Sequence, residues 1–326
     1  MNDAATFESL FGARERIHTE LSKAVVGQRD VIDQILVAML TGGNCLITGA
    51  PGLAKTLLVK SLAQVFKLNF NRIQFTPDLM PADITGMDIL QDGPQGRSLQ
   101  FVPGPVFAQM LLADEINRTP PKTQAALLEA MQEKQVTVSG RRYPLPSPFF
   151  VLATQNPVEM EGTYVLPEAQ LDRFMFNVII DYLPEAEEIE VVQRTTAPAR
   201  EGVEGLFGME DVLAFQALVR TVPVGQDVVA FAVRLAASSR PQQAGAPDFV
   251  RKFVNWGAGT RAAQCLILGA KVLAIWAGRA HVTVEDVRAL ATPVLRHRIQ
   301  LNYKAEAEGI TVENLIQRLL QGARVA

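Results

Sequence analysis

Hydrophobic and polar positions follow two different patterns along the chain, and the change comes near residue 184. Before it, short apolar runs typical of buried strands alternate with stretches whose apolar residues recur at helical spacing. The strand-like runs cover residues 45–48, 71–75, 110–113, 149–153 and 176–181. This alternation predicts a mostly parallel sheet with helices on both faces.

After residue 184 the strand signals fade and helical patterns remain, as in GMEDVLAFQALVR and TVEDVRALATPVLRHR. Thr283 is placed to cap the second of these helices, with Asp286 three residues later. The segment 239–247 is rich in turn-forming residues and predicts a loop within the helical part. We therefore expect an α/β domain over residues 1–183, with helices at its start, and a smaller helical domain over 184–326.

Two segments of the first domain have the pattern of hairpins. In 134–146, Val136 and Val138 alternate with polar residues and are followed by Ser139 and Gly140, which suit a tight turn. In 88–107, a Gly-Pro turn separates two alternating stretches. The apolar residues of both segments, Phe101 included, fit either ordinary packing or contact with a partner.

Composition narrows the class of protein. The chain has 326 residues, 48% of them hydrophobic, and a formal net charge of −3, which gives no overall attraction to nucleic acid or to an anionic membrane. The start of the chain lacks the basic and apolar regions of a signal peptide, and the most apolar stretch, 262–278, is interrupted by polar residues and reads as a buried helix. Cys45 and Cys265 are far apart, and the three histidines are scattered, so neither a disulfide nor a metal cluster is indicated. We expect a cytoplasmic protein.

The stretch NCLITGAPGLAKTLLVKSLA joins a strand-like run to a helical one through a loop of small residues. Residues 49–56 match the phosphate-binding pattern Gly-x4-Gly-Lys-Ser/Thr except at Ala54, where the pattern has glycine. Backbone N–H groups of such a loop surround phosphates, and Lys55 is expected to contact the β and γ phosphates while the Thr56 hydroxyl binds Mg²⁺. The alternative is a chance turn before a helix. The residues expected to contact the nucleotide are Gly49, Ala50, Pro51, Gly52, Leu53, Ala54, Lys55, Thr56 and Leu57.

A pair of acids ends the third strand-like run, in MLLADEINR. A buried parallel strand would deliver Asp114 and Glu115 to the carboxyl edge of the sheet, where open α/β sheets bind ligands. Asp114 suits a Mg²⁺ ligand, and Glu115 suits a base that accepts a proton from an attacking water. The alternative, that both merely cap the next helix, does not explain why they accompany Lys55.

Two later segments add polar residues at strand ends. The run FFVLATQNP ends in Thr154 to Asn156, and Asn156 could orient water against the γ phosphate, although Asn before Pro is also a common turn. Asp172 and Arg173 precede the last strand-like run. Taken alone, these two residues indicate a surface ion pair.

The segments GAPGLAKT, LLADEINR, VLATQNP, PEAQLDRF and GAGTRA occur in the order and approximate spacing found in AAA+ ATPases. Together they closely resemble the MoxR family, and the resemblance covers the chain from about residue 24 to beyond residue 298. It implies a five-stranded nucleotide-binding domain, a helical lid and assembly into a homo-oligomeric ring, usually of six subunits. The segment 88–107 resembles the insertion in the second helix that defines this branch of AAA+ proteins.

The resemblance also implies roles for single residues. Lys55 and Thr56 resemble the Walker A pair, and Asp114 and Glu115 the Walker B pair. Asn156 resembles the first sensor, Arg173 the arginine finger and Arg261 the second sensor. Val26 and Gly27 match the segment that lines the adenine pocket, and a helix-entry turn is their other interpretation.

The expected function is ATP hydrolysis with Mg²⁺ that drives chaperone-like remodelling, maturation or activation of protein complexes. The resemblance implies a protein client and a partner with a von Willebrand factor A domain. Three alternatives stay open at this point: a chelatase-like motor subunit for metal insertion, a nucleic-acid motor, and a nucleotide-dependent binding switch with little turnover. The one small basic cluster of the two hairpin segments, Arg141 and Arg142, is too slight for a duplex-binding surface, so nucleic acid is disfavoured.

Overall fold

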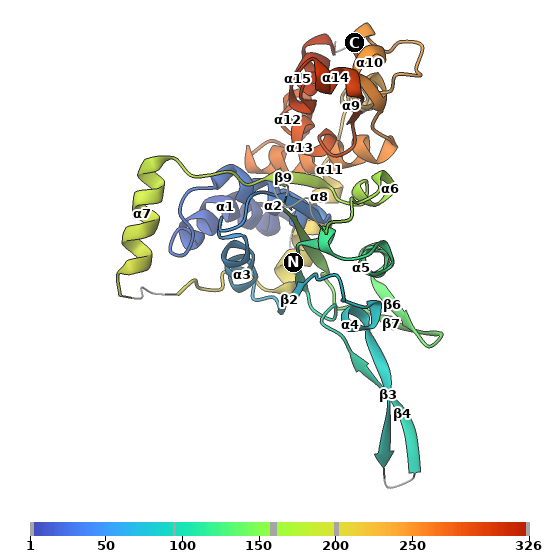
Figure 1. Ribbon diagram of the computed structural model, residues 1–326. Helices are drawn as coiled ribbons and strands as arrows, with labels where there is room; N and C mark the ends of the chain where they lie inside the picture. Colours follow the sequence, from blue (N-terminus) through green and yellow to red (C-terminus); the bar gives the residue numbers. More distant parts are fainter. Residues whose placement is uncertain (1–2, 94–95, 157–161, 199–201, 324–326) are drawn as a thin grey trace.

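The computed structural model describes residues 3–93, 96–156, 162–198 and 202–323. Its centre is a parallel sheet with helices packed around it (Figure 1). The five strands of this sheet have the order β2-β5-β8-β1-β9. The strands are β1 (Cys45–Thr48), β2 (Phe70–Gln74), β5 (Met110–Asp114), β8 (Phe150–Gln155) and β9 (Phe176–Ile179). The five strands expected from the sequence are confirmed, with ends that agree to within two residues.

Helices cover both faces of the sheet, as the alternating pattern predicts. Successive side chains of a strand point to opposite faces. Cys45 and Ile47 therefore join a core with α1 (Asp3–Leu21), α2 (Arg29–Thr41) and α3 (Lys55–Val65). Leu46, between them, packs on the other face with α5 (Pro121–Glu133) and the short α4 (Pro81–Thr85).

Both expected hairpins are present. The longer one, β3 (Gly86–Gly93) and β4 (Gly96–Pro103), projects away from the sheet, and its predicted Gly-Pro turn involves residues 94–95, outside the described residues (Figure 1). The shorter one is β6 (Gln135–Val138) and β7 (Arg141–Pro144), with Ser139 and Gly140 at positive φ as its turn requires. Phe101 of β4 stacks on Tyr143 of β7, with ring centroids 3.9 Å apart. Phe101 thus packs, and it links the two hairpins.

The chain after β9 is mainly helical. Its helices are α7 (Glu185–Thr196), α8 (Met209–Thr221), α9 (Gln226–Ser238), α10 (Asp248–Phe253), α11 (Thr260–Trp276), α12 (Val284–Ala289), α13 (Ala291–Leu295), α14 (Tyr303–Ala307) and α15 (Val312–Gly322). A small ladder joins β10 (Val254–Trp256) to β11 (Gln300–Leu301). The loop expected over 239–247 is present, and the Thr283 N–H donates to Asp286 Oδ2 at the start of α12.

The helical part is not uniform in its packing. The apolar α11 is largely buried, as expected, and α8 packs against α1 and α2 beside the sheet. Helix α7 stands apart at one side of the molecule, and none of its residues is buried (Figure 1). Among the described residues, no helix is long and apolar enough to cross a membrane.

Candidate active site

The phosphate-binding pattern forms a loop between β1 and α3, where the sequence predicts it. Gly49 is required there, because an added Cβ would lie 2.4 Å from the backbone oxygen of Ile180. Gly52 has a φ of +85°, and Ala54 has a φ of 54° in the left-handed region. Since that region favours glycine, alanine keeps the loop geometry at a cost of about 1 to 2 kcal/mol.

The start of α3 carries free donor groups and one lysine. The N-cap residue, Ala54, offers no side-chain hydrogen bond to this helix, and the first N–H groups of an α-helix have no partner within it. The Lys55 Nζ donates to the backbone oxygen of Gly49 at 2.6 Å, which holds the side chain against the loop. Burial lowers the pKa of Lys55, and the nearby carboxylates of Asp114 and Glu115 oppose this effect. The predicted lysine and acids therefore lie close together.

Asp114 is the last residue of β5 and is buried. Its Oδ1 accepts a hydrogen bond of 2.6 Å from Thr154 Oγ1 on the neighbouring strand β8. Its Oδ2 accepts one of 2.6 Å from Arg72 Nη2 on β2. Two strands thus fix the carboxylate at the edge of the sheet.

Glu115 follows β5 with a left-handed backbone, φ 58°. Its N–H donates to Thr154 Oγ1 at 2.8 Å, so one hydroxyl positions both acids. Its Oε2 accepts from Gln74 Nε2 at 2.8 Å and from Arg118 Nε at 3.1 Å. Left-handed non-glycine residues of this kind are enriched at active sites.

Arg72 and Gln74 were missed by sequence reasoning. They lie on either side of Ile73 in β2, and the strand register pairs Gln74 with Asp114. A polar face on a strand next to the one that carries the acids could have identified them.

Asn156 follows directly after β8 and is buried. Because β5, β8 and β1 are adjacent and parallel, their carboxyl ends meet at one edge of the sheet. The structure therefore brings Asn156 to the same edge as the acids and the loop that carries Lys55.

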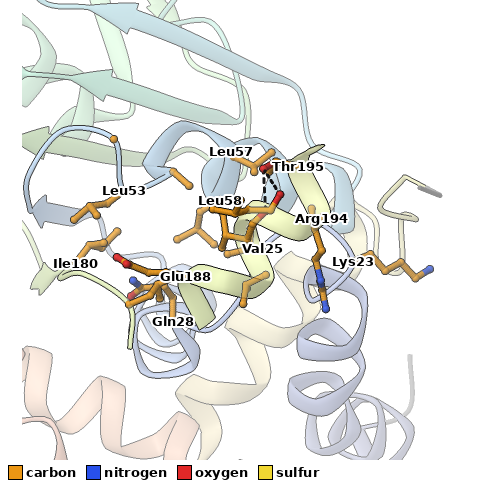
Figure 2. A pocket seen from close by; sticks show the side chains of 17 residues that line it. Lys23, Val25, Gln28, Leu53, Leu57, Leu58, Ile180, Glu188, Arg194 and Thr195 are labelled. Carbon is orange, nitrogen blue, oxygen red and sulfur yellow. Dashed lines mark hydrogen bonds between the residues drawn. The ribbon is translucent and has the colours of Figure 1, made fainter. Parts of the chain in front are cut away.

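A largely apolar cavity of about 500 Å³ adjoins the loop (Figure 2). Its walls come from the segment after α1, from the loop and the start of α3, from the segment after β9, and from α7. Among the residues predicted to contact the nucleotide, those that line it are Val26, Gly52, Leu53, Ala54 and Leu57. Gly27 lines the adjacent hollow instead, at a φ of +66°. An apolar cavity with few polar groups suits a flat heterocycle.

Arg173 lies at the amino ends of the strands, opposite the carboxyl ends that carry the loop and the acids. It comes three residues before the amino end of β9, whereas the loop follows the carboxyl end of the parallel neighbour β1. Within the described part of the chain, its side chain makes no hydrogen bond or ion pair. Arg173 therefore does not join the loop and the acids of its own chain.

Asp172 does not pair with Arg173, so the surface-pair interpretation is wrong. Its carboxylate accepts from Arg298 Nε at 2.7 Å and from Arg261 Nη1 at 3.4 Å. Arg298 is almost fully buried and also donates to the carbonyl oxygens of Phe174 and Met175. The helical part is thus anchored beside Arg173, and Arg261 shares this corner. The pairing joins residues more than 80 positions apart, and no local pattern signals it.

Comparison with known proteins gives a consistent result. Residues 44–176 match the ATPase family associated with various cellular activities (AAA), and residues 249–319 match the AAA lid domain. The chain is 43% identical to the chaperone MoxR1 of Mycobacterium tuberculosis, over 94% of this chain and 81% of that protein. It is 30% identical to the protein MoxR of Methylorubrum extorquens, over 89% and 88% of the two chains.

A solved structure agrees with the fold. The crystal structure of a candidate ATPase from Cytophaga hutchinsonii superposes with a TM-score of 0.90 at 40% identity, covering 99% of this chain and 98% of that one. The chain belongs to the MoxR family of AAA+ ATPases.

Proposed function

We propose that the chain hydrolyses ATP with Mg²⁺ and uses the energy to remodel or mature other proteins. The observation that supports this most directly is the meeting of Lys55, Asp114 and Glu115 at the carboxyl edge of adjacent parallel strands. One cation and two carboxylates around an uncapped helix start suit a polyphosphate with its metal ion.

The residues fit ATP in three respects. The uncapped start of α3 offers backbone N–H groups to phosphate oxygens, and Lys55 adds a charge-assisted contact. The Gly49–Leu57 loop residues would surround the phosphates, while the apolar cavity with Val26, and Gly27 beside it, would take the adenine.

The residues also fit Mg²⁺, which prefers oxygen ligands and usually keeps several waters. The Thr56 hydroxyl and the Asp114 carboxylate would hold it. When bound, the ion neutralises charge that develops on the phosphate oxygens.

Glu115 would accept the proton of the attacking water, and Asn156 would orient that water. Thr154 holds the backbone of Glu115, and Gln74 and Arg118 hold its carboxylate. Releasing this carboxylate from the two donors is the step that would free it to act as a base.

Arg173 and Arg261 would act on the nucleotide of a neighbouring subunit. Arg173 is at the sheet edge away from its own loop, and Arg261 shares its corner through Asp172. An assembly that brings this corner to the next nucleotide site would let both arginines act there, which supports a ring, with six subunits as the family resemblance implies. In this arrangement residues 1–183 form the nucleotide-binding domain and 184–326 the lid.

The physiological role would be that of a cytoplasmic chaperone-like machine with a protein client and a partner carrying a von Willebrand factor A domain. The relatives named chaperone or MoxR support the class of role. The two hairpins, joined through Phe101 and Tyr143, are suitable elements to contact a client.

Separate tests of Lys55 and Glu115 examine the chemistry. Lys55→Ala should weaken ATP binding by at least tenfold, because it removes a charge-assisted contact, whereas Glu115→Gln should bind ATP normally and lower turnover at least a hundredfold. Lys60→Ala is the matched control, an exposed lysine on the same helix. Binding is followed with a fluorescent ATP analogue and turnover by phosphate release. Equal loss of binding in both variants, with intact folds, would remove Glu115 from the role of base.

A further inference from the structure

Helix α7 presents an acidic and apolar stripe that is exposed along its length and borders the nucleotide cavity through Glu188 and Val192. Glu185, Glu188, Ile189 and Val192 follow each other at helical spacing and so share one side of the helix. Ile189 is 51% exposed and Val192 60%. A helix of this length is marginal in water without tertiary packing, so a covering partner would stabilise it.

A groove in the lid has the complementary character. It encloses about 660 Å³, with Phe231, Phe249 and Leu319 among its lining residues. Arg234 and Arg318 also line it, and none of the described lining residues carries a carboxylate. The Arg318 guanidinium lies 4.1 Å above the Phe249 ring, and neither arginine has a carboxylate partner within the described residues. An occupant of this groove should be apolar and acidic.

The positions of the two surfaces suit a head-to-tail contact. Figure 1 shows α7 at one side of the molecule and the groove helices α9, α10 and α15 at the far end of the lid. Ring assembly through a head-to-tail contact requires two different patches on each subunit. Helix α7 borders the nucleotide cavity, and Asp172 joins the Arg173 corner to the lid. A neighbour that brings Arg173 to this cavity therefore also brings its lid toward α7.

We propose that α7 of one subunit docks into the arginine-lined lid groove of the next copy of this chain. The inference rests on the proposed ring, and it assigns the ring a second contact besides Arg173. Ile189 and Val192 would enter the apolar groove, and Glu185 and Glu188 would pair with Arg234 and Arg318. Because α7 also lines the nucleotide cavity, this contact joins each nucleotide site to the lid of the neighbour.

Charge reversal tests the docking. Arg234→Glu with Arg318→Glu, and separately Glu185→Arg with Glu188→Arg, should each raise the protein concentration for half-assembly with ATP at least tenfold. A chain carrying all four reversals should return to within about threefold of the parent. Lys304→Glu, an exposed reversal on the same lid outside the groove, is the control. Sedimentation is compared at equal nucleotide occupancy, because Glu188 lines the nucleotide cavity.

A cross-linking experiment supplies an independent measurement. Chains with Ile189→Cys are mixed with chains carrying Gln243→Cys, a groove residue, and treated with a short bis-maleimide in the presence of ATP. The native Cys45 and Cys265 are buried. We expect a linked dimer here and none when Lys304→Cys replaces Gln243→Cys.

The outcomes separate the two proposals. A parent protein that neither assembles nor hydrolyses ATP contradicts the proposed function. A parent that does both, while the groove and helix reversals assemble like the parent and no selective cross-link forms, overturns the docking of α7 alone.

Discussion

Asp172 is one third exposed, yet removing its carboxylate should lower the free energy of unfolding more than the loss of a surface carboxylate does. In Asp172→Asn, the Arg298 guanidinium, with 1% of its side chain exposed, loses its ion-pair partner at 2.7 Å. Breaking a buried pair by removing one partner costs about 3 to 5 kcal/mol. The carbonyls of Phe174, Met175 and Val294 still accept from Arg298, and water reaches Asp172, so we expect a loss of about 2 to 3 kcal/mol.

The assay is urea unfolding followed by circular dichroism at pH 7. The matched control is Asp92→Asn, which removes a carboxylate paired with Arg97 where both side chains are more than 70% exposed. This control should change the free energy of unfolding by less than about 1 kcal/mol. The reasoning is refuted if Asp172→Asn costs no more than the control. The variant should also keep ATP binding and lose turnover, because Arg173 follows the anchored residue directly.

Two further changes probe single positions. Ala54→Gly should raise the free energy of unfolding by about 0.5 to 1 kcal/mol, because the relief of the left-handed backbone exceeds the entropy that glycine adds to the unfolded chain. Thermal unfolding measures this change, and a loss of stability would contradict the prediction. His297 Nε2 donates to the backbone oxygen of Phe174, and His297 Nδ1 is buried. Burial lowers the pKa of this imidazole well below 6.5, and the charges of Arg298 and Arg296 lower it further. The unfolded chain then binds more protons below pH 6.5, so stability should fall as the pH drops through this range, by up to about 1.4 kcal/mol per unit. His297→Gln keeps a donor and should flatten that fall, whereas His281→Gln, at an exposed site, should leave it unchanged.

The sequence was informative where short-range patterns carry the structure. The strand-like runs 45–48 and 110–113 are bounded by polar residues, and their position in a parallel sheet places Lys55, Asp114 and Glu115 at one edge. Local pattern also predicted both hairpins and the apolar α11.

The rest depends on contacts between distant parts of the chain. The pairing of Asp172 with Arg298 spans 126 positions, and it turns an apparent surface pair into the anchor of the lid. The donors to the acids, Arg72 and Gln74, become visible only once β2 is known to pair with β5. Contacts between residues far apart in the sequence decide these features.

The central claim is that Arg173 serves the nucleotide site of a neighbouring subunit, and a mixing experiment tests it most directly. An arginine finger is worth about three to five orders of magnitude in turnover, so Arg173→Ala and Glu115→Gln should each be nearly inactive while still binding ATP. In mixed rings, some interfaces join an intact Glu115 to a neighbour's intact Arg173. Phosphate release across mixing ratios, with co-assembly confirmed by sedimentation, should therefore rise well above that of either protein alone. If mixed rings form and activity never exceeds that of the separate variants, the account is contradicted.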